Sequence, residues 1–375
     1  MRYTRTLQTI GMSAVLCAMS ACHTSIHIGD PATDNHDEHS MAPVIVRPVA
    51  TYSIVARDAA TGRLGVAVQS HWFSVGSAVP WAQAGVGAVA TQSLVNRSFG
   101  PDGLALMDEG FPADRALAKV LKRDDGREYR QVAMIDSDGG VGAFTGELCI
   151  THASHQTITL DDGSVLSVQA NLMARQGVPE AMIEGYQHPE GGDSFEHKLL
   201  SALFAAQNAG GDIRGKQSAA MLVVEGERQD EPWQGVVTDI RVEDHRDPLD
   251  ELARLVTIAK AYEAMNAGDI ALEHGDDDAA LRHYGRALTF LRSPEIAFWT
   301  AVSLVNAGFE ERATPFFAYA FWDPSGDWRE TLRRLPDSEL FPDDADLLER
   351  ILEIRPDAHA RLTLDDNDDT DDNQP

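Results

Sequence analysis

The chain has 375 residues, of which 43% are hydrophobic, so it can bury the core of one large domain or of two smaller ones. It carries 59 acidic and 31 basic residues. The resulting net charge of -28 disfavours binding to a phosphate backbone, which requires clustered lysine and arginine. We therefore expect a globular protein without a nucleic-acid partner.

The N-terminus has the features of an export signal. Arginines precede a run of small and apolar residues at 10–21 that is too short to span a bilayer as an ordinary helix. The run ends in the letters MSAC at 19–22, which resemble a bacterial lipobox, so we predict a signal peptide over 1–21 and lipidation of Cys22. Ordinary signal cleavage beside an incidental cysteine is the alternative. Both place the protein in the bacterial cell envelope, either lipid-anchored or periplasmic or extracellular. A lipid anchor at Cys22 is the only membrane contact that we expect.

Residues 22–50 are rich in His, Asp, Pro and Ser and are predicted to be a tether that links the anchor to the folded part. Histidines and aspartates in this tract could capture a metal ion, but their spacing matches no closed site. We interpret the segment as a solvated linker. No metal site and no cofactor are expected in the chain.

The chain contains only three cysteines, Cys17, Cys22 and Cys149. Once the signal is removed and Cys22 is lipidated, Cys149 is the sole remaining thiol and no intrachain disulfide is available. Cys149 follows a predicted strand, which favours a structural thiol over a nucleophile. A catalytic thiol would need a nearby base, and the sequence leaves open whether His152 or His155 supplies one.

Residues 51–247 alternate between β-rich runs and helical stretches. Apolar residues recur at helical spacing over 112–122 and 195–208. The further strands that we predict are 64–69, 85–91, 130–136, 141–145, 165–170, 219–224 and 236–242. This order is compatible with two antiparallel sheets packed face to face under helices, so an α+β domain is expected.

Residues 248–356 have the pattern of long helices. Two small-aromatic-small sets recur about 33 residues apart, namely Ala280, Tyr284 and Ala287, then Ala313, Phe317 and Ala320. This spacing is close to the tetratricopeptide period of about 34 residues. We predict a small all-α, tetratricopeptide-like region that docks on the first domain, and an ordinary helical appendage is an equal alternative. The acidic segment 357–375 is predicted to be disordered.

The folded part opens with a hydroxyl residue, Thr51, at the start of a predicted strand over 51–58. If the bond between Ala50 and Thr51 were cut, the freed α-amine, with a reference pKa of about 7.7–8.0, could serve as a base for the hydroxyl of the same residue. The alternative is that Thr51 and Ser53 are simply β-prone residues of a half-buried strand.

Several sequence motifs between Thr51 and Arg254 resemble those of domain-of-unknown-function family 1028. This family is assigned to the Ntn-hydrolase superfamily of N-terminal-nucleophile amidohydrolases. The motifs are GVAVQSH at 65–71, VPWA at 79–82, AGVGAVATQ at 84–92, GPDGL at 100–104, TG at 145–146, QAN at 169–171, GGDIRGKQSAA at 210–220 and RVEDH at 241–245. The resemblance implies a four-layered αββα sandwich over 51–247. It also implies that Thr51 is a candidate nucleophile, without naming a substrate.

A reaction at Thr51 would need hydrogen-bond donors placed in advance for the tetrahedral oxyanion. Asn171, just after a predicted strand, is the first candidate, although an asparagine at a strand end also closes turns. Gln69, Ser70 and His71 end one predicted strand and Gln92 ends another, so these polar groups are expected to line the same mouth. Gln69, His71 and Gln92 are the substrate-binding candidates among them. A lone histidine such as His71 is more often structural.

The glycine-rich loop 210–218 combines one acid with two bases. Arg214 could hold a substrate carboxylate through two hydrogen bonds, and Asp212 could orient Arg214 or the nucleophile's amine, as a third catalytic candidate. A clamp between the two that supports a tight turn is equally consistent. The pair 244–245, Asp-His, resembles half of a hydrolase triad, but without a placed serine we interpret it as a packing feature.

The leading hypothesis is an exported hydrolase that acts on an amide or related C–N bond of a small molecule or peptide. Whether the domain is an enzyme is left open, because Thr51 lacks a free amine if Cys22 is the mature N-terminus. The alternative is a non-catalytic envelope module that binds peptides or cell-wall fragments. The sequence leaves the substrate and a homo-oligomeric state open.

Overall fold

The computed structural model describes residues 51–362 and residue 364. The predicted signal peptide, Cys22, the tether and the bond before Thr51 therefore lie outside the described residues, as does most of the acidic tail. In the described part, no helix is long and apolar enough to cross a membrane.

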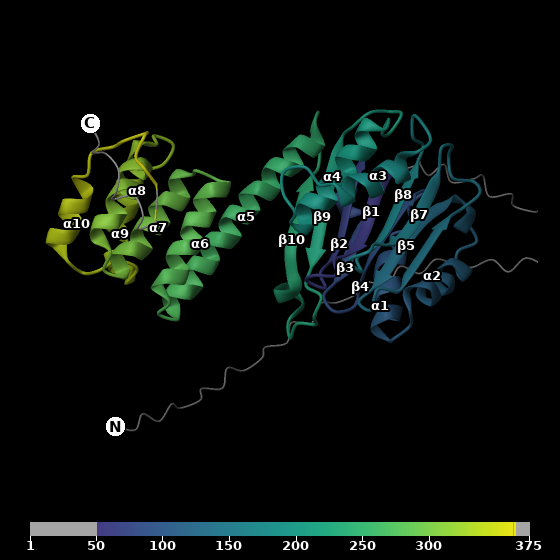
Figure 1. Ribbon diagram of the computed structural model, residues 1–375, viewed down its shortest axis with the longest axis horizontal. Helices are drawn as coiled ribbons and strands as arrows, with labels where there is room; N and C mark the ends of the chain where they lie inside the picture. The colour runs from purple at the N-terminus through teal and green to yellow at the C-terminus, as the bar shows by residue number, and fades with distance from the viewer. Residues whose placement is uncertain (1–50, 363, 365–375) are drawn as a thin grey trace, which may run out of the picture. The chain divides into compact units, whose positions relative to one another are not determined.

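Thr51 begins the first strand of a six-stranded antiparallel sheet, whose order is β10-β9-β2-β1-β8-β7 (Figure 1). The strands are β1 (Thr51–Arg57), β2 (Leu64–Ser70), β7 (Ser154–Thr159), β8 (Val165–Asn171), β9 (Ser218–Val224) and β10 (Val236–Val242). The register sets Thr51 opposite Ser70 of β2 and opposite Asn171 of β8. The start of β1 is thus enclosed by a strand on each side.

A second antiparallel sheet has four strands in the order β3-β4-β5-β6. They are β3 (Pro80–Gln83), β4 (Gly87–Ser93), β5 (Arg130–Asp136) and β6 (Val141–Thr145). Alternate side chains of each sheet point into the space between the two, because successive residues of a strand face opposite sides. Val55, Val66, Val68, Ala90 and Ile135 are among the residues of this shared core.

Helices cover the outer face of each sheet. α1 (Phe99–Asp108) and α2 (Ala113–Lys122) pack on the four-stranded sheet, and α3 (Val178–Gln187), α4 (Phe195–Asn208) and the first half of α5 (Pro248–Glu273) pack on the six-stranded sheet. The predicted α+β domain with two antiparallel sheets, followed by a helical region, is confirmed. Two strands, β3 and β7, and two helices, α1 and α3, were not predicted individually.

The helix α5 begins at Pro248, where the helical region was predicted to start, and it contributes residues to two hydrophobic cores. Leu252 and Val256 complete the core on the outer face of the six-stranded sheet. Ala261 and Met265, further along the same helix, belong to the core of the helical region. The boundary predicted at residue 247 therefore coincides with a change in the sequence pattern. It does not separate the two hydrophobic cores, because α5 contributes to both.

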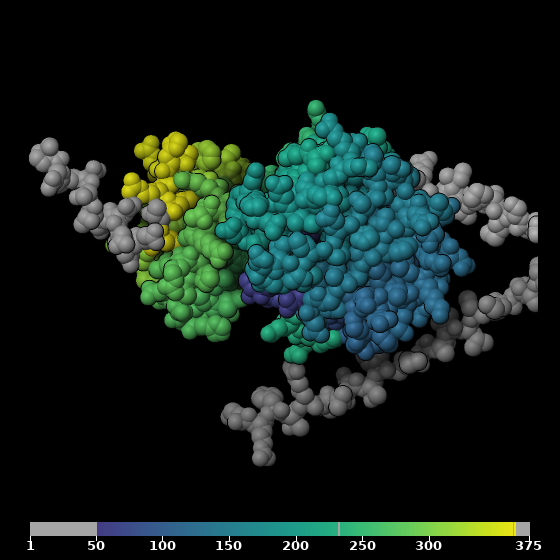
Figure 2. All heavy atoms as spheres, turned by 45° about the vertical axis from the view of Figure 1, so that its right-hand side comes forward, coloured from purple at the N-terminus to yellow at the C-terminus, as the bar shows by residue number. Residues whose placement is uncertain are grey.

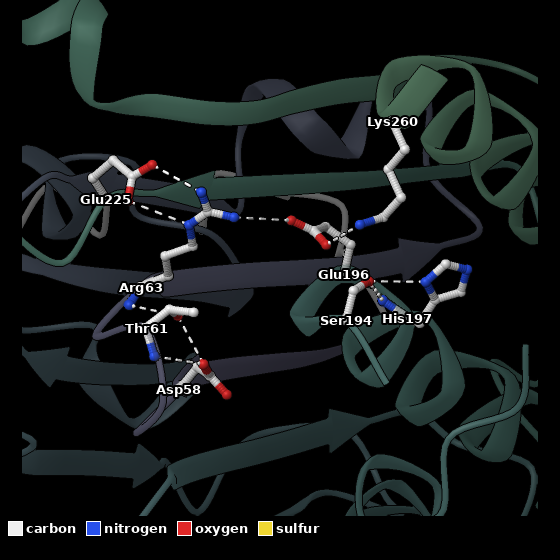
Figure 3. Close-up of polar contacts among 8 residues, drawn as sticks. All are labelled: Asp58, Thr61, Arg63, Ser194, Glu196, His197, Glu225 and Lys260. Carbon is white, nitrogen blue, oxygen red and sulfur yellow. Dashed lines mark hydrogen bonds and ion pairs between the residues drawn. The ribbon is translucent and has the colours of Figure 1, made fainter. Parts of the chain in front are cut away.

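A buried ion-pair network ties α5 to α4 (Figure 3). Glu196 of α4 accepts a hydrogen bond from Nζ of Lys260 of α5 at 2.7 Å, and the guanidinium of Arg63 lies 3.9 Å from its other carboxylate oxygen. Arg63 also pairs with Glu225 at 3.0 Å. Burial alone would raise the pKa of Glu196, but the hydrogen bond and the positive charge of Lys260 outweigh it and hold that pKa below its usual range.

The helical region continues with α6 (Asp277–Phe290), α7 (Pro294–Asn306), α8 (Glu310–Trp322), α9 (Trp328–Arg334) and α10 (Ala345–Leu352). The described part also contains short 3-10 helices at Val75–Ser77, Arg127–Tyr129, Pro232–Gly235 and Pro336–Ser338. The two predicted small-aromatic-small sets occupy α6 and α8, and all six side chains are buried. Their aromatic members, Tyr284 and Phe317, both belong to the core of the helical region.

The segment that follows α10 corrects the predicted start of the disordered tail at residue 357. The backbone N–H of Asp357 donates to the carbonyl of Ala318 at 2.9 Å, and Ala360 and Leu364 are buried in the helical core. Apolar side chains spaced along this short stretch hold it against α8. The ordered helical region thus extends beyond the predicted boundary.

Candidate functional site

The alternation of side chains along β1 and β2 decides which residues meet at Thr51. Thr51, Ser53 and Val55 face the space between the sheets, whereas Tyr52 faces the helices. The same alternation turns Ser70 towards Thr51 and turns Gln69 to the helix side of the sheet. Gln69, which the sequence assigned to the mouth of the site, is therefore on the wrong face for that role.

The hydroxyl and the carbonyl of Thr51 are both held by neighbouring strands. Thr51 Oγ1 donates a hydrogen bond to Ser70 Oγ at 3.2 Å. The Thr51 carbonyl oxygen accepts from Gln92 Nε2 at 3.3 Å and from Asn171 Nδ2 at 3.4 Å. All four residues are almost completely buried, with Thr51 itself 0% exposed. Thr51, Gln92 and Asn171, which the sequence predicted together, are thus brought together.

Gln131 of β5 hydrogen-bonds to the side-chain amides of both Gln92 and Asn171 and so orients them. Its Oε1 accepts from Gln92 Nε2 at 2.7 Å and from Asn171 Nδ2 at 3.0 Å. Its Nε2 donates to Thr145 Oγ1 at 2.8 Å and to the Ala170 carbonyl at 3.0 Å. Because a buried amide with both ends bonded fixes the orientation of its partners, Gln131 determines where Gln92 and Asn171 point.

A second layer of polar side chains lies one step further along the strands. Ser53 Oγ donates to Gln92 Oε1 at 2.6 Å and accepts from Gln169 Nε2 at 2.7 Å. Ser167 Oγ in turn donates to Gln169 Oε1 at 3.1 Å. Buried polar groups that are bonded in this way make the space between the sheets rigid at this end.

The loop before β9 contains a clamp between Asp212 and Arg214. The Asp212 carboxylate accepts hydrogen bonds from the Arg214 guanidinium at 2.8 and 3.1 Å and from the Arg214 backbone N–H at 2.9 Å. It also accepts from the backbone N–H of His71 at 3.0 Å, which joins this loop to the end of β2. Of the two interpretations drawn from the sequence, the contacts favour the turn-supporting clamp.

The hydrogen-bond partners of Thr51 named above are neutral groups. The partners Ser70, Gln92 and Asn171 carry neutral hydroxyl or amide groups, which do not accept a proton near neutrality. Asp212 is engaged in its clamp, and the Nδ1 atom of His71 lies 3.4 Å from the Lys216 carbonyl oxygen.

A cavity of about 650 Å³ opens beside the buried amides, between the loop after β6 and the loop after β8. His155 lines it, and its Nδ1 lies 2.8 Å from Thr145 Oγ1, so the ring connects the cavity to Gln131. Burial lowers the pKa of His155 and favours the neutral imidazole. Across the described residues, no three His, Cys, Asp or Glu side chains are grouped as a metal site would require.

Cys149 also lines this cavity, and its surroundings favour a structural thiol. Its Sγ donates to the Arg130 carbonyl at 3.3 Å. Burial raises the pKa of the thiol, which disfavours the thiolate that a nucleophile requires. The hydrogen bond of His155 goes to Thr145 and not to the thiol.

Gln131 was missed as a site candidate, and Ser70 was placed at the same mouth from the sequence but was not selected as a site residue. Ser70 could have been chosen over Gln69 by counting in steps of two along β2 from Val66 and Val68. Gln131 had no comparable signal, because its strand belongs to the other sheet and lies far from Thr51 in the sequence. Only the packing of the two sheets brings it to the site.

Residues 51–252 match the family model described as "Family of unknown function (DUF1028)". The chain is also similar to protein SPO2555 from Silicibacter pomeroyi, whose crystal structure is described under the same family model. The two are 29% identical over 56% of this chain and 89% of that one, with a TM-score of 0.49. No curated protein matches the chain.

Proposed function

Because the chain belongs to DUF1028, a family of unknown function, we propose its activity from the residues around Thr51. The proposal is an exported hydrolase of an amide or related C–N bond, built on an Ntn-hydrolase-like αββα sandwich, with Thr51 as nucleophile after cleavage of the Ala50–Thr51 bond. One observation carries it. Thr51 begins the domain with its hydroxyl between the sheets, where it donates to Ser70, and with its carbonyl held by the amides of Gln92 and Asn171.

In the proposed reaction the α-amine of Thr51 takes the proton from Oγ1 as that oxygen attacks the carbonyl carbon of the amide. The amine then passes the proton to the leaving nitrogen, the C–N bond breaks, and an ester on Thr51 remains. Water, activated by the same amine, hydrolyses the ester and releases the acid. The long contact of Asn171 with the Thr51 carbonyl is the one that this residue gives up to bind the oxyanion.

The burial of Thr51 supports a precursor that must be cut before it can react. Thr51 is 0% exposed, and on the face drawn in Figure 2 only a small purple patch of the first strands is visible among green, teal and blue residues. A nucleophile enclosed in this way meets no substrate while its amine is part of a peptide bond. Cleavage would supply the amine and an end of the chain that can move aside.

Intact-mass measurement and N-terminal sequencing of the protein purified from its own envelope test this proposal. We expect some chains to begin at Thr51, and an amide-directed electrophile to label that residue. Labelling should increase as the pH rises through about 7.7–8.0, because only the unprotonated α-amine is a base. Thr51→Ala should abolish labelling. The matched control Ser53→Ala, which changes the next hydroxyl on the same face of β1, should retain it.

If every chain begins at Cys22 and Thr51→Ala is labelled like the wild type, the nucleophile proposal fails. The envelope binding module then becomes the better proposal. Its supporting observation is a cavity of about 720 Å³ in the helical region, lined by Arg292, Tyr319 and Trp322 among others. On this second proposal the helix pairs α5-α6 and α7-α8 act as a tetratricopeptide-like unit that binds a peptide or cell-wall fragment.

We also propose that the protein is anchored to an envelope membrane by a lipid on Cys22, for the sequence reasons given above. Metabolic labelling with radioactive palmitate should mark the wild-type protein and not Cys22→Ser. The variant should also move from the membrane fraction to the soluble fraction. Retention of Cys22→Ser in the membrane fraction would show that the lipid is not the anchor.

A further inference from the structure

A cavity of about 530 Å³ lies in the outer helical layer, between α3, α4, α5 and the loop that joins α3 to α4. Its lining shares no residue with the hydrogen-bonded set around Thr51. Leu200 and Phe204 of α4 and Ala253 of α5 give it apolar walls. Pockets that enclose a small molecule usually have a volume of about 300–1,000 Å³. The cavity therefore has the size and the walls to hold a largely apolar compound.

The two hydroxyl side chains that line the cavity are already bonded within the protein. Ser201 Oγ accepts a hydrogen bond from the backbone N–H of Glu190 at 3.0 Å. Thr257 Oγ1 donates to a backbone carbonyl of its own helix at 3.0 Å. His188, Glu190 and Asn208 also line the cavity, but they are exposed, so water competes for their hydrogen bonds. None of these groups offers a ligand an uncontested polar contact.

The imidazole of His197 is the polar group of the lining that a ligand can use. Its Nδ1 lies 2.9 Å from Ser194 Oγ, and Figure 3 shows the other ring nitrogen turned away from Ser194. A Cβ at Gly191 or Gly192 would lie 3.7 Å from Cδ2 or 3.4 Å from Nδ1 of the ring, so the loop between α3 and α4 packs against it. Within residues 51–362, Nε2 has no hydrogen-bond partner. The ring is thus held by its neighbours with one nitrogen unused.

The charges near this nitrogen favour a neutral ligand. Burial lowers the pKa of His197 and the positive charge of Lys260 lowers it further, against the opposite effect of Glu196, so the ring is neutral near pH 7. Lys260 disfavours a cation beside His197, and Glu190 in the lining disfavours an anion. A hydroxyl group suits Nε2 in either tautomer of the ring, because it both donates and accepts.

We propose that this cavity is a ligand site separate from Thr51, which binds a neutral aromatic compound through a hydrogen bond between its hydroxyl group and His197 Nε2. Phe204 in the wall favours an aromatic ring, since aromatic pairs attract beyond their burial. The ligand contacts α5, which contributes to both hydrophobic cores, and it stabilises the folded protein by mass action. The site does not rest on the proposed function.

Titration of the full-length protein with 2-naphthol and with naphthalene, followed through the fluorescence of each probe, tests the site. The probes share their rings, and only 2-naphthol carries a hydroxyl group. We expect the wild type to bind both. His197→Phe keeps a planar ring and removes both nitrogens, so the preference for 2-naphthol over naphthalene should fall about fivefold, the usual effect of one hydrogen bond. An unchanged preference, or a wild type that binds neither probe, would overturn the proposal.

Two further variants locate the bound probes. Ala253→Phe places a ring inside the cavity and should abolish the binding of both probes. His188→Phe removes the other histidine of the lining and should leave the preference unchanged. Thermal unfolding checks that each variant is folded. Binding that persists in a folded Ala253→Phe protein would place the probes elsewhere and sink the proposal.

Chemical modification gives a reading that needs no variant. Diethylpyrocarbonate acylates neutral imidazole nitrogens, and mass spectrometry reports the rate at each histidine. Saturating 2-naphthol should slow the modification of His197 several-fold and leave that of His274, exposed at the end of α5, unchanged. An unprotected His197 would equally contradict the site. Either failure leaves the nucleophile proposal standing, because Thr51→Ala should bind both probes like the wild type.

Discussion

Lys260→Met is expected to lower the free energy of unfolding by about 3–5 kcal/mol, the usual cost of removing one partner from a buried ion pair. Only 4% of the Glu196 side chain and 11% of the Lys260 side chain are exposed. The substitution leaves a carboxylate enclosed in protein with Arg63 at 3.9 Å as its remaining cation. Methionine keeps the length of the lysine stem, so the loss reports the charge and not the packing.

Urea unfolding followed by circular dichroism measures this loss, with Arg254→Met as the matched control. Arg254 also lies on α5 and pairs with Glu251 at 2.6 Å, but its side chain is 59% exposed. Exposed pairs are screened by water and contribute little, so Arg254→Met should leave the unfolding midpoint nearly unchanged. If both variants lost the same free energy of unfolding, burial would not make the Glu196–Lys260 pair more stabilising than an exposed pair.

The effect of Lys260→Met should also depend on pH. The pKa of Glu196 is lower in the folded protein than in the unfolded chain. A carboxyl group with a lowered folded pKa contributes stability above its unfolded pKa of about 4.3, and that contribution disappears as the pH falls through the folded value. The difference between wild type and Lys260→Met should therefore be full near neutrality and shrink in acid below about pH 4.

Gly268→Ala is expected to lower the free energy of unfolding by about 1–3 kcal/mol, although alanine is the better helix former. A Cβ at Gly268 of α5 would lie 2.5 Å from a ring carbon of Tyr284 in α6. The ring cannot easily retreat, because it is fully buried and its hydroxyl donates to Asp269 at 2.7 Å. The close approach of α5 and α6 therefore depends on the missing side chain.

Gly285→Ala in α6 is expected to change the free energy of unfolding in the opposite direction. A Cβ at Gly285 would meet nothing within 4 Å, so this variant should gain about 0.5–1 kcal/mol from helix propensity alone. Thermal unfolding of both variants checks the pair. A stabilised Gly268→Ala protein would show that the helix pair accommodates the extra methyl group and that the packing argument is wrong.

Elements whose residues follow a clear local pattern could be predicted from the sequence alone. The predicted bounds of β5, β6, β10 and α4 are the observed ones, because apolar residues recur in each at the period of its secondary structure. β7 was missed since its letters SHQTIT form a polar, mostly solvent-facing edge strand with no buried alternation. A strand with few apolar residues gives no local signal, because its position depends on contacts with other elements.

For the site, the sequence determined that a hydroxyl residue opens the domain and that Asn171 and Gln92 end strands near it. It did not determine which face of a strand each side chain takes, and Gln69 was therefore chosen where Ser70 is found. That choice depends on strand register, which is fixed by the burial of Val66 and Val68 against the other sheet.

The long-range contacts could not be predicted from the sequence, because they form only when distant elements pack together. Gln131 reaches Asn171 from the opposite sheet, and Lys260 reaches Glu196 from a helix 64 residues further along the chain. No local pattern predicts such pairs, because each side chain satisfies its own element equally well without its partner. The partner is needed only once packing removes both groups from water, where an unpaired amide or charge is costly.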